Sequence, residues 1–470
     1  MPDKIKNGLF IFHRDLRIVD NIGLLEASSR CEHLYTCFIF TPEQVGPTNS
    51  YRSDSAITFM IESLDELKDD IRKAGGELIL IYGKTTDLVE KLIKKLEIGG
   101  VFFNKDYSPY AIERDNELSR MCSNIAVPIE RREKENIICE MFSDYYLYEP
   151  GTVVTGGGKA YKKFTPFYDT VRGNKVLSPR ASPSRWNLRA TKVSIGSPLP
   201  SFLTVKKKDH TSLDVPGGRT AAKARLQNAC REQKHYEKGR DEFTYQTTYL
   251  SAYIKFGCVS IREVYSAFKE RGYHDIIREL IWREFFAHVL FSYPEVLNGS
   301  YQPRFKHIPW RKSAADFNKW KKGETGFPIV DACMRQLNQT GYMHNRGRMV
   351  VASFLIKVLL LDWRLGERYF AQQLRDYDPA SNNGNWQGIS GTGVDMKPYF
   401  RDMNPWIQGA KFDKDGAFIK KWVPELKDVQ SKDIHRWNET CEENRKRGIK
   451  YPCPMVDYAE QKEKMLRLYQ

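Results

Sequence analysis

Short apolar runs alternate with amphipathic helical patterns along the first 135 residues of the chain. The runs that predict β-strands lie at 9–13, 35–40, 78–82, 101–104 and 125–129. Helices are predicted at 55–72, 87–96 and 111–121, where apolar residues recur at three-to-four spacing. Strands that alternate with helices in this way indicate a Rossmann-like α/β domain with a parallel sheet. The glycine motifs that hold phosphates, GxGxxG and GxxxxGK[ST], are missing from it.

The pattern changes after residue 135. Turn-rich stretches at 178–186, 196–201 and 215–218, with a basic run at 206–210, predict a long surface connector. From about residue 220 onward helical periodicity dominates. We therefore expect an α/β domain over 1–135, a connector over 136–219 and an all-α domain over 220–470.

Composition places the protein among ordinary globular proteins: of its 470 residues, 41% are hydrophobic and 28% charged. No apolar run approaches the roughly 18–20 residues of a membrane span, and the N-terminus lacks the core of a signal peptide. The nine cysteines are dispersed without a CxxC pair, which predicts reduced thiols and no metal site. We expect a soluble, intracellular protein without membrane contact; cytoplasm and nucleus are not distinguished.

The net charge of +15 is unevenly distributed. Residues 1–150 carry 19 basic and 26 acidic side chains, so the remaining residues carry 55 and 33. Such a basic second part indicates a polyanionic partner such as nucleic acid, although a merely solvated positive field has the same composition.

One predicted helix, 278–291, places Glu279, Trp282 and Arg283 on a common face. These side chains could grip a flat polar ligand, or they could be a core tryptophan beside a surface ion pair. The segment 341–354 places Asn345 near Arg348 by the same spacing.

Two further segments are rich in small polar groups. Residues 376–393 contain Asp, Asn and Gly around a single tryptophan and lack helical periodicity, so we predict a ligand-binding loop. Thr247 and Thr248 precede an apolar helix, where they could bind a diphosphate or simply cap the helix. No hydrolase triad or HExxH motif is present.

From FIFHRDLRIVDN (10–21) to KKWVPELKDV (420–429) the chain resembles the cryptochrome/photolyase family, above all its class I cyclobutane pyrimidine dimer (CPD) DNA photolyases. The long run at 323–370, which begins GETGFPIVDACMRQ, is highly specific to that family. The resemblance implies an N-terminal antenna domain and a C-terminal helical domain that binds FAD. It leaves open whether an antenna chromophore is bound and whether that is a folate or a deazaflavin.

The resemblance also implies site residues. Those implied to bind FAD are Tyr236, Thr247, Thr248, Tyr249, Leu250, Ser251, Glu279, Arg283, Arg348, Asp376, Asp378 and Asn382. Among them, Arg348 and Asp376 are expected to form an ion pair, and Asn382 to face flavin N5. Three tryptophans, Trp386, Trp363 and Trp310, match the chain that passes electrons to the flavin, whereas Trp320 is expected to be structural.

On the DNA side, the resemblance implies a pocket for a dimer flipped out of the duplex. The residues implied to bind DNA are Arg240, Glu279, Trp282, Asn345, Arg346, Met349 and Arg401. Asn345 and Met349 stand where (6-4) photolyases have histidines, so a (6-4) substrate is not expected. Gly388 replaces a tryptophan that often stacks on the lesion, which suggests weakened lesion binding that Trp406 could partly offset.

Three hypotheses follow. The leading one is a monomeric enzyme, a deoxyribodipyrimidine photo-lyase, that repairs UV-damaged DNA with reduced FAD. The alternative is a cryptochrome-like photoreceptor with little or no repair activity, which Gly388 favours and Asn382 disfavours. A light-independent flavoprotein that binds DNA would leave the three matching tryptophans unexplained.

Overall fold

The structure is a computed structural model that describes residues 4–129, 132–193, 195–196, 198–203, 215–395 and 401–469. The side chains at 126–135 are not described. The basic run predicted at 206–210 therefore lies outside the described residues.

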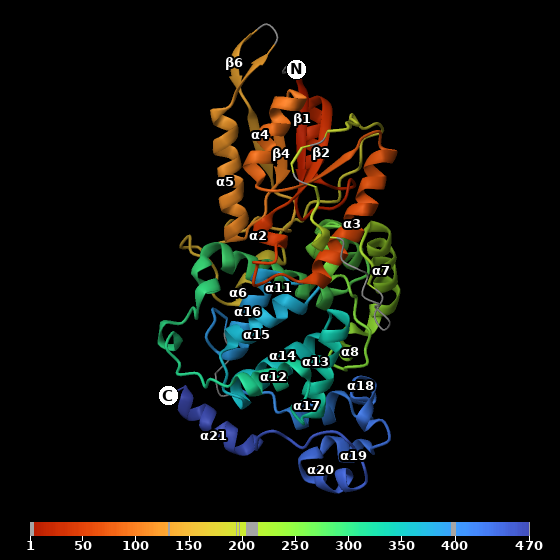
Figure 1. Ribbon diagram of the computed structural model, residues 1–470, viewed down its shortest axis with the longest axis vertical. Helices are drawn as coiled ribbons and strands as arrows, with labels where there is room; N and C mark the ends of the chain where they lie inside the picture. Colours follow the sequence, from red (N-terminus) through yellow and green to blue (C-terminus); the bar gives the residue numbers. More distant parts are fainter. Residues whose placement is uncertain are drawn as a thin grey trace.

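A parallel sheet with helices on both faces forms the N-terminal domain, at the top of Figure 1. Within the described residues it has five strands, in the order β3-β2-β1-β4-β7. Their bounds are β1 (Ile5–Phe12), β2 (Cys31–Phe40), β3 (Leu78–Tyr82), β4 (Gly100–Asn104) and β7 (Ile138–Phe142). The helices are α1 (Ile22–Arg30), α2 (Pro42–Val45), α3 (Asp54–Lys73), α4 (Thr85–Leu96) and α5 (Pro109–Asn124). The predicted α/β class is confirmed.

Alternation along β1 assigns each side chain to one of two cores. Phe10 and Phe12 face the core beneath α1 and α3, whereas Leu9 and Ile11 face the core beneath α4 and α5. Because both faces of a parallel sheet are covered, its strands are apolar throughout. This explains why periodicity located β1, β2, β3 and β4.

The fifth strand of the sheet differs from the prediction. The segment 125–129 was expected to join the sheet, but β5 (Ala126–Ile129) pairs antiparallel with β6 (Arg132–Asn136). Pro128 has no N–H to donate to a ladder, which suits a strand in a small separate hairpin. The place beside β4 is taken by β7, which lies beyond residue 135.

Part of the predicted connector is structured. Helix α6 (Phe164–Val171) buries Phe164 and Phe167 against helix α11 (His274–Ser292). These contacts anchor the connector to the helical part of the molecule.

Helices form the rest of the described chain, in the lower part of Figure 1. From residue 219 to 322 they are α7 (Arg219–Glu232), α8 (Tyr236–Gly239), α9 (Ser251–Lys255), α10 (Ile261–Lys269), α11 and α12 (Ala314–Lys322). From 328 to 390 they are α13 (Pro328–Thr340), α14 (Asn345–Ser353), α15 (Trp363–Gln373) and α16 (Pro379–Ser390). The last are α17 (Pro405–Phe412), α18 (Ala417–Trp422), α19 (Ser431–His435), α20 (Trp437–Lys446) and α21 (Tyr458–Leu468).

The two domains share one hydrophobic core. Phe59 of α3 stacks on Phe256 with ring centroids 5.3 Å apart and meets Tyr253 edge-on at 5.1 Å. All three rings are buried. The α/β domain is therefore packed directly against the helices that carry the candidate site.

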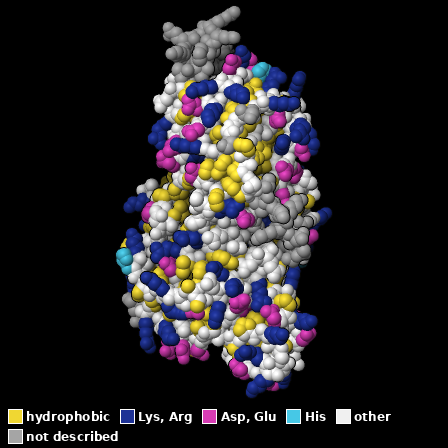
Figure 2. All heavy atoms as spheres, viewed as in Figure 1, with side chains coloured by type: hydrophobic (Ala, Val, Ile, Leu, Met, Phe, Trp, Pro, Cys, Tyr) yellow, Lys and Arg dark blue, Asp and Glu magenta, His cyan; other side chains and the backbone are white. Residues whose placement is uncertain are grey.

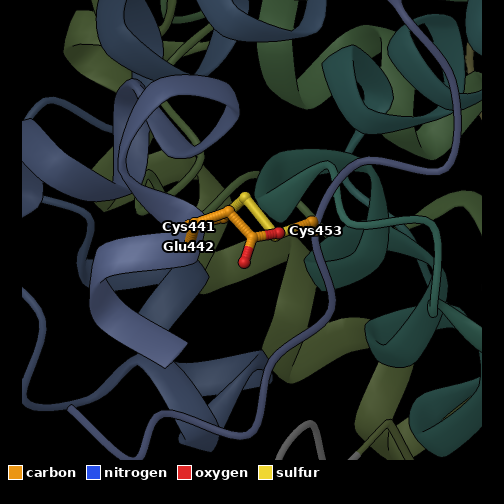
Figure 3. A group of neighbouring side chains, drawn as sticks. All are labelled: Cys441, Glu442 and Cys453. Carbon is orange, nitrogen blue, oxygen red and sulfur yellow. A yellow bond between two sulfur atoms is a disulfide. The ribbon is translucent and has the colours of Figure 1, made fainter. Parts of the chain in front are cut away.

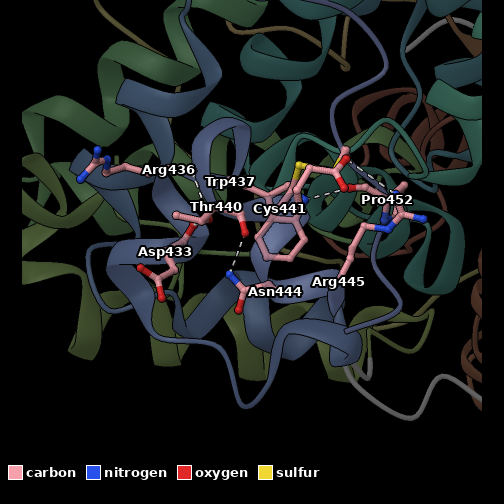
Figure 4. Close-up of a disulfide and its surroundings, with 10 residues drawn as sticks. Asp433, Arg436, Trp437, Thr440, Cys441, Asn444, Arg445 and Pro452 are labelled. Atoms are coloured by element: carbon pink, nitrogen blue, oxygen red, sulfur yellow. Dashed lines mark hydrogen bonds and ion pairs between the residues drawn. A yellow bond between two sulfur atoms is a disulfide. The ribbon is translucent and has the colours of Figure 1, made fainter. Parts of the chain in front are cut away.

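Cys441 and Cys453 form a disulfide (Figure 3), so the prediction that every cysteine is a reduced thiol is wrong for this pair. They lie 12 residues apart, and the chain folds back after α20 to bring their Cα atoms to 5.5 Å. Beside the disulfide, the Trp437 indole donates a hydrogen bond to Pro452 O at 2.8 Å (Figure 4). Since the two sulfurs bond each other, they present no thiolate to a metal despite the nearby Glu442 carboxylate.

The surface carries both signs of charge. Figure 2 shows Lys and Arg side chains spread over the whole of one face, with acidic side chains between them. No helix in the described part of the chain combines the length and apolar character needed to cross a bilayer.

Candidate functional site

An ion pair between α14 and the chain before α16 lies at the centre of the site. Arg348 Nη2 lies 2.9 Å from Asp376 Oδ2, as the family resemblance implied. Burial opposes ionisation of Asp376, but the Arg348 guanidinium and a hydrogen bond from Ser251 hold its pKa below the ordinary value. The Arg348–Asp376 pair and its Ser251 neighbour thus bring together helix α14, the chain before α16 and the segment at 251, which are distant in sequence.

The segment 376–393, predicted to be a loop, is mostly helix α16. Asp378 caps the helix by accepting a hydrogen bond from Ser381 N at 3.0 Å, and Pro379 occupies the first turn. Gly391 ends it in a left-handed conformation. The helix has no apolar stripe because its exposed and buried faces both carry small polar residues, so periodicity could not predict it.

Arg14 of the α/β domain reaches into this site and was not predicted. Its Nη2 lies 2.6 Å from Asp378 Oδ2 and its Nη1 lies 3.3 Å from Asp106 Oδ1. Burial would raise the pKa of Asp378, but Arg14 holds it at about 2. The only sequence signal is the position of Arg14 directly after β1, where parallel strands present ligand-binding residues.

Arg283 of α11 lies against two aromatic rings that meet each other edge-on. Its guanidinium carbon lies 4.3 Å from the ring centroids of both Tyr145 and Tyr146. Its Nη1 also donates to the fully buried Glu284 at 2.9 Å. Burial raises the pKa of Glu284 to about 7 although Arg283 opposes the shift. Arg283 therefore presents its remaining N–H groups in a fixed orientation.

The Thr247–Thr248 segment is close to the ion pair, but the expected helix begins later and is short. Helix α9 begins at Ser251 and has 5 residues. Before it, Tyr249 adopts a left-handed φ of 51°, an uncommon conformation for this residue type that recurs at ligand sites. Thr247 hydrogen-bonds Tyr342 at 3.1 Å, and Leu250 is buried. Any ligand at this segment would therefore be bound by hydroxyls and by the N–H groups of a turn, because helix α9 is too short to supply a strong dipole.

Asn382 is held firmly by α15. Its Nδ2 donates to Glu367 O at 3.0 Å and to Glu367 Oε1 at 2.9 Å. Both partners are acceptors, so the atom between them must be the nitrogen, and Oδ1 is the atom left for a ligand. Sequence analysis missed Glu367.

The three predicted electron-transfer tryptophans lie in neighbouring segments. Trp363 starts α15 and Trp386 packs on the first turn of that helix, where a Cβ at Gly366 would lie 2.1 Å from Trp386 Cη2. Trp310 is placed beside this turn because the adjacent Arg311 N donates to Leu360 O at 2.9 Å. Trp363 and Trp386 are buried, whereas Trp310 is half-buried.

Trp320 also contacts this group. It is fully buried, its indole N–H donates to Val351 O at 3.1 Å, and its ring meets Trp386 edge-on at 6.4 Å. The satisfied indole agrees with a packing role.

Glu279 and Arg240 pair with each other, with Oε1 and Nη1 2.6 Å apart. Burial raises the pKa of Glu279, and Arg240 partly offsets the shift. Tyr236 lies beside the pair, 5.8 Å from the Arg240 guanidinium to the ring centroid. Two residues predicted for different tasks, a base contact and a phosphate contact, thus form one unit.

Trp282 is part of an aromatic cluster. Its ring stacks on Phe164 at 3.6 Å with an interplanar angle of 6°, and Asp395 fixes Phe164 by accepting from its N–H at 2.9 Å. At Gly388, the one atom of the described residues that an added Cβ would meet is Asp395 O, at 3.9 Å. Among these residues there is therefore room for a Cβ at this position. Trp406 stacks on Phe327 at 4.6 Å.

The other predicted DNA contacts differ in exposure. Asn345, which begins α14, and Arg401 are exposed, and Met349 is half-buried on α14. Arg346 is only 15% exposed, with Nη2 2.5 Å from Asp241 Oδ2 and its guanidinium 4.1 Å from the Phe412 ring. In this conformation Arg346 supports the surface rather than extending from it.

The chemistry of these donors fits FAD. Threonine, serine and tyrosine hydroxyls and two arginines suit a diphosphate, and aspartates that accept hydrogen bonds suit ribose and ribityl hydroxyls. The carboxamide of Asn382 offers an acceptor of the kind a protonated ring nitrogen needs. Of these groups, Ser251 donates to Asp376, and Thr247 hydrogen-bonds Tyr342, whose ring lies 5.8 Å from the Arg348 guanidinium.

The chain matches two family models: DNA photolyase over residues 9–184, and FAD binding domain of DNA photolyase over residues 276–470. It is 36% identical to a deoxyribodipyrimidine photo-lyase of Agrobacterium fabrum, over 97% of this chain and 96% of the relative. A crystal structure of an archaeal photolyase from Sulfolobus tokodaii, described with two FAD molecules, is 37% identical with a TM-score of 0.86, covering 98% of this chain and 99% of that one. A cryptochrome from Synechocystis sp. is 27% identical with a TM-score of 0.88, covering 100% of both chains.

Proposed function

Because the chain belongs to the cryptochrome/photolyase family, we propose that it is a light-driven DNA repair enzyme that splits cyclobutane pyrimidine dimers. The observation that carries the proposal is helix α16, which presents Asn382 to the candidate FAD site and packs Trp386 on its buried side. A flavin beside Asn382 would therefore have a buried indole one helical turn away.

The reaction needs one electron and no net oxidation. The dimer accepts the electron, the two C–C bonds that join its pyrimidines break, and the electron leaves the separated pyrimidines. Reduced FAD, excited by light, supplies and recovers that electron when bound. The protein contributes placement and electrostatics.

The predicted FAD-binding residues would hold and orient the cofactor. Arg283 and Arg348 would present N–H donors to the flavin and ribose from fixed orientations, and Asp376 and Asp378 would accept hydroxyl hydrogen bonds there. Thr247 and Ser251 would contribute hydroxyls near the Arg348–Asp376 pair, and Tyr236 would contribute its hydroxyl from beside Arg240. Each of these groups is already held by a protein partner, which reduces the cost of ordering on binding.

Lesion binding would use the Glu279–Arg240 unit. Glu279 can accept a hydrogen bond from a pyrimidine N–H, and Arg240 stays close enough to stabilise the carboxylate. Asn345 and Arg401, both exposed, are available for the backbone around an extruded dimer. Asn345 and Met349, in place of the histidines of (6-4) photolyases, support the CPD substrate.

The tryptophans would keep the flavin reduced. Trp386, Trp363 and Trp310 run from the buried face of α16 to a half-buried position. Indole is easily oxidised, so this succession suits electron passage from the surface inward.

An antenna chromophore remains an open part of the proposal. A parallel sheet binds ligands where its strand order reverses, here between β1 and β4, which is where His13 and Asp106 lie. A folate or a deazaflavin is the expectation from family resemblance, and the relative from Sulfolobus tokodaii adds FAD to the chemical classes to test.

A cryptochrome-like photoreceptor is the second candidate, favoured by Gly388. Measuring DNA affinity in the dark distinguishes the two candidate functions. A repair enzyme binds an oligonucleotide that contains a dimer more tightly than the same undamaged sequence. Equal affinity for both, with FAD bound, would favour the photoreceptor.

A further inference from the structure

The chain that leads into α17 is held by side chains of a neighbouring helix. Residues 401–404, all of them described, form no helix or strand, so their main-chain groups need partners from elsewhere. Arg401 O accepts a hydrogen bond from Lys357 Nζ at 2.5 Å, and Met403 N donates to Ser353 Oγ at 3.1 Å. Lys357 and Ser353, the two anchors, therefore fix the path of this segment.

Both anchors are buried. Lys357 is 4% exposed and Ser353 is 2% exposed. A buried ammonium group is costly unless hydrogen bonds satisfy it, so the bond from Lys357 to the Arg401 carbonyl is not readily exchanged for a bond to water. The two contacts are therefore part of the packed interior, unlike the contacts of mobile surface side chains.

The anchors share one helix face with a third contact. Arg346, Ser353 and Lys357 are spaced by seven and four residues, which places them on one face of the helix formed by α14 and η5 (Phe354–Val358). At the first of these positions, Arg346 Nη1 donates to Gln408 Oε1 at 3.2 Å. One face of this helix therefore contacts the chain at three points between residues 401 and 408.

The anchoring helix changes register just before it ends. Its last turn, η5, is π-helical, and Leu359 N donates to Phe354 O, five residues back, at 2.9 Å. Such turns are rare and recur at functional sites. Lys357 lies in this turn, so the widened helix sets the position from which the ammonium group reaches the Arg401 carbonyl.

The anchored segment carries a side chain predicted to bind DNA. Arg401 is exposed, although its carbonyl is bound by the buried Lys357. The next residue, Asp402, accepts a hydrogen bond from the phenol of Tyr458 in α21. With the bond at Met403, three successive residues are held, and the Arg401 guanidinium extends from a fixed main chain.

We propose that Lys357 and Ser353 are positioning residues for DNA binding: they fix the main chain at 401–403 so that the Arg401 guanidinium meets a backbone phosphate. The inference rests on the proposed function in one respect, that Arg401 contacts DNA. A guanidinium binds phosphate through paired N–H donors, so its orientation matters as well as its charge. A segment ordered before DNA arrives also avoids the entropic cost of ordering on binding.

Amide hydrogen exchange of the FAD-loaded protein without DNA tests the anchoring. Ser353→Ala removes the acceptor of Met403 N and changes no charge, and Lys357→Met removes the ammonium group but keeps a long side chain. We expect exchange at Met403 to be about fivefold faster in Ser353→Ala, the effect of losing one neutral hydrogen bond, and faster also in Lys357→Met. Ser63→Ala is the matched control, because Ser63 is 1% exposed and its Oγ also accepts a main-chain N–H, from Gly218 at 3.0 Å.

A double-variant comparison tests whether the anchors act through Arg401. The affinity for a dimer-containing oligonucleotide is measured over a range of salt concentrations. Arg401→Gln should lower the affinity about tenfold and reduce the salt slope by about 1, which corresponds to one lost phosphate contact. In the Ser353→Ala or Lys357→Met background the same substitution should lower the affinity only about twofold, because the guanidinium is no longer held at the phosphate.

Three results would overturn the proposal. They are unchanged exchange at Met403 in both anchor variants, an equal rise in Ser63→Ala, and an equal effect of Arg401→Gln with and without the anchors. The outcome is separable from the proposed function. If exchange and affinity respond as expected but light restores no dimer, the repair function fails and the role of the anchors stands. If light repairs dimers while exchange stays as in the wild type, the role of the anchors fails alone.

Discussion

Arg14 and Asp378 lie 364 positions apart in sequence, and their side chains meet at 2.6 Å. The arginine follows β1 of the α/β domain, and the aspartate caps α16 of the helical domain. The pair is 16% and 12% exposed, so water screens it only weakly. It couples the domain interface to the helix that carries Asn382 and Trp386.

Arg14→Gln should destabilise the protein and weaken FAD binding. Removing one partner leaves a buried carboxylate uncompensated, a loss of about 3 kcal/mol in the free energy of unfolding. The folded-state pKa of Asp378 is lowered from 3.8 to about 2, so its stabilisation is present above pH 4 and is lost as the pH falls toward 2. Denaturant unfolding across this range should show a shallower pH dependence in the variant.

A matched control for this change is Arg120→Gln. Arg120 belongs to the same domain and lies 3.3 Å from Glu113, but both side chains are 68% exposed. Exposed ion pairs contribute little. Equal effects of the two substitutions would show that the Arg14–Asp378 pair has no special role.

Trp363→Phe should block light-driven reduction of oxidised flavin while leaving repair by chemically reduced protein nearly unchanged. Phenylalanine keeps most of the packing but is much harder to oxidise than indole. Trp320→Phe is the control, because that indole is also buried and meets Trp386 at 6.4 Å. Transient absorption after a flash measures both variants; loss of photoreduction in Trp320→Phe alone would exclude the proposed route.

Gly388→Trp should increase affinity for a dimer-containing oligonucleotide about tenfold, since base–aromatic stacking contributes about 1–3 kcal/mol. Among the described residues, an added Cβ meets Asp395 O alone, at 3.9 Å, which is ordinary van der Waals contact. Gly388→Leu, apolar but not aromatic, separates stacking from burial. Equal affinities of the wild type and Gly388→Trp would contradict the account of this position.

Replacing Cys441 and Cys453 together by serine should lower the melting temperature. Closing a loop of this length by a disulfide stabilises a fold by about 3 kcal/mol in the chain-entropy model. Dithiothreitol should lower the melting temperature of the wild type and not that of the double variant. Cys230→Ser, at a buried free cysteine, is the control for loss of a sulfur atom.

Sequence periodicity predicted the elements that bury a continuous apolar face. Strands β1, β2, β3 and β4 and helices α3, α4 and α5 are of this kind, because their side chains pack in the two cores that cover the faces of the sheet. Helix α16 was missed because its stability comes from the Asp378 cap, from Gly391 and from contacts of Trp386 with another helix, none of which produces an apolar period.

Site residues that belong to a family motif could be predicted from the sequence. Residues whose partners lie in distant segments could not. The Arg348–Asp376 pair followed from family resemblance and is confirmed. Arg14 and Glu367 were not predicted because their partners come from another segment or the other domain. The disulfide was missed for the same reason, since the return of the chain after α20 cannot be read from cysteine spacing.

Illuminated repair tests the central claim most directly. The FAD-loaded protein, chemically reduced, is mixed with a dimer-containing oligonucleotide in light and in darkness, and the recovery of pyrimidine absorbance is followed. The account predicts recovery in light and none in darkness, with a slower rate in Glu279→Ala. Recovery in darkness, or no recovery in light while the flavin stays reduced, would contradict it.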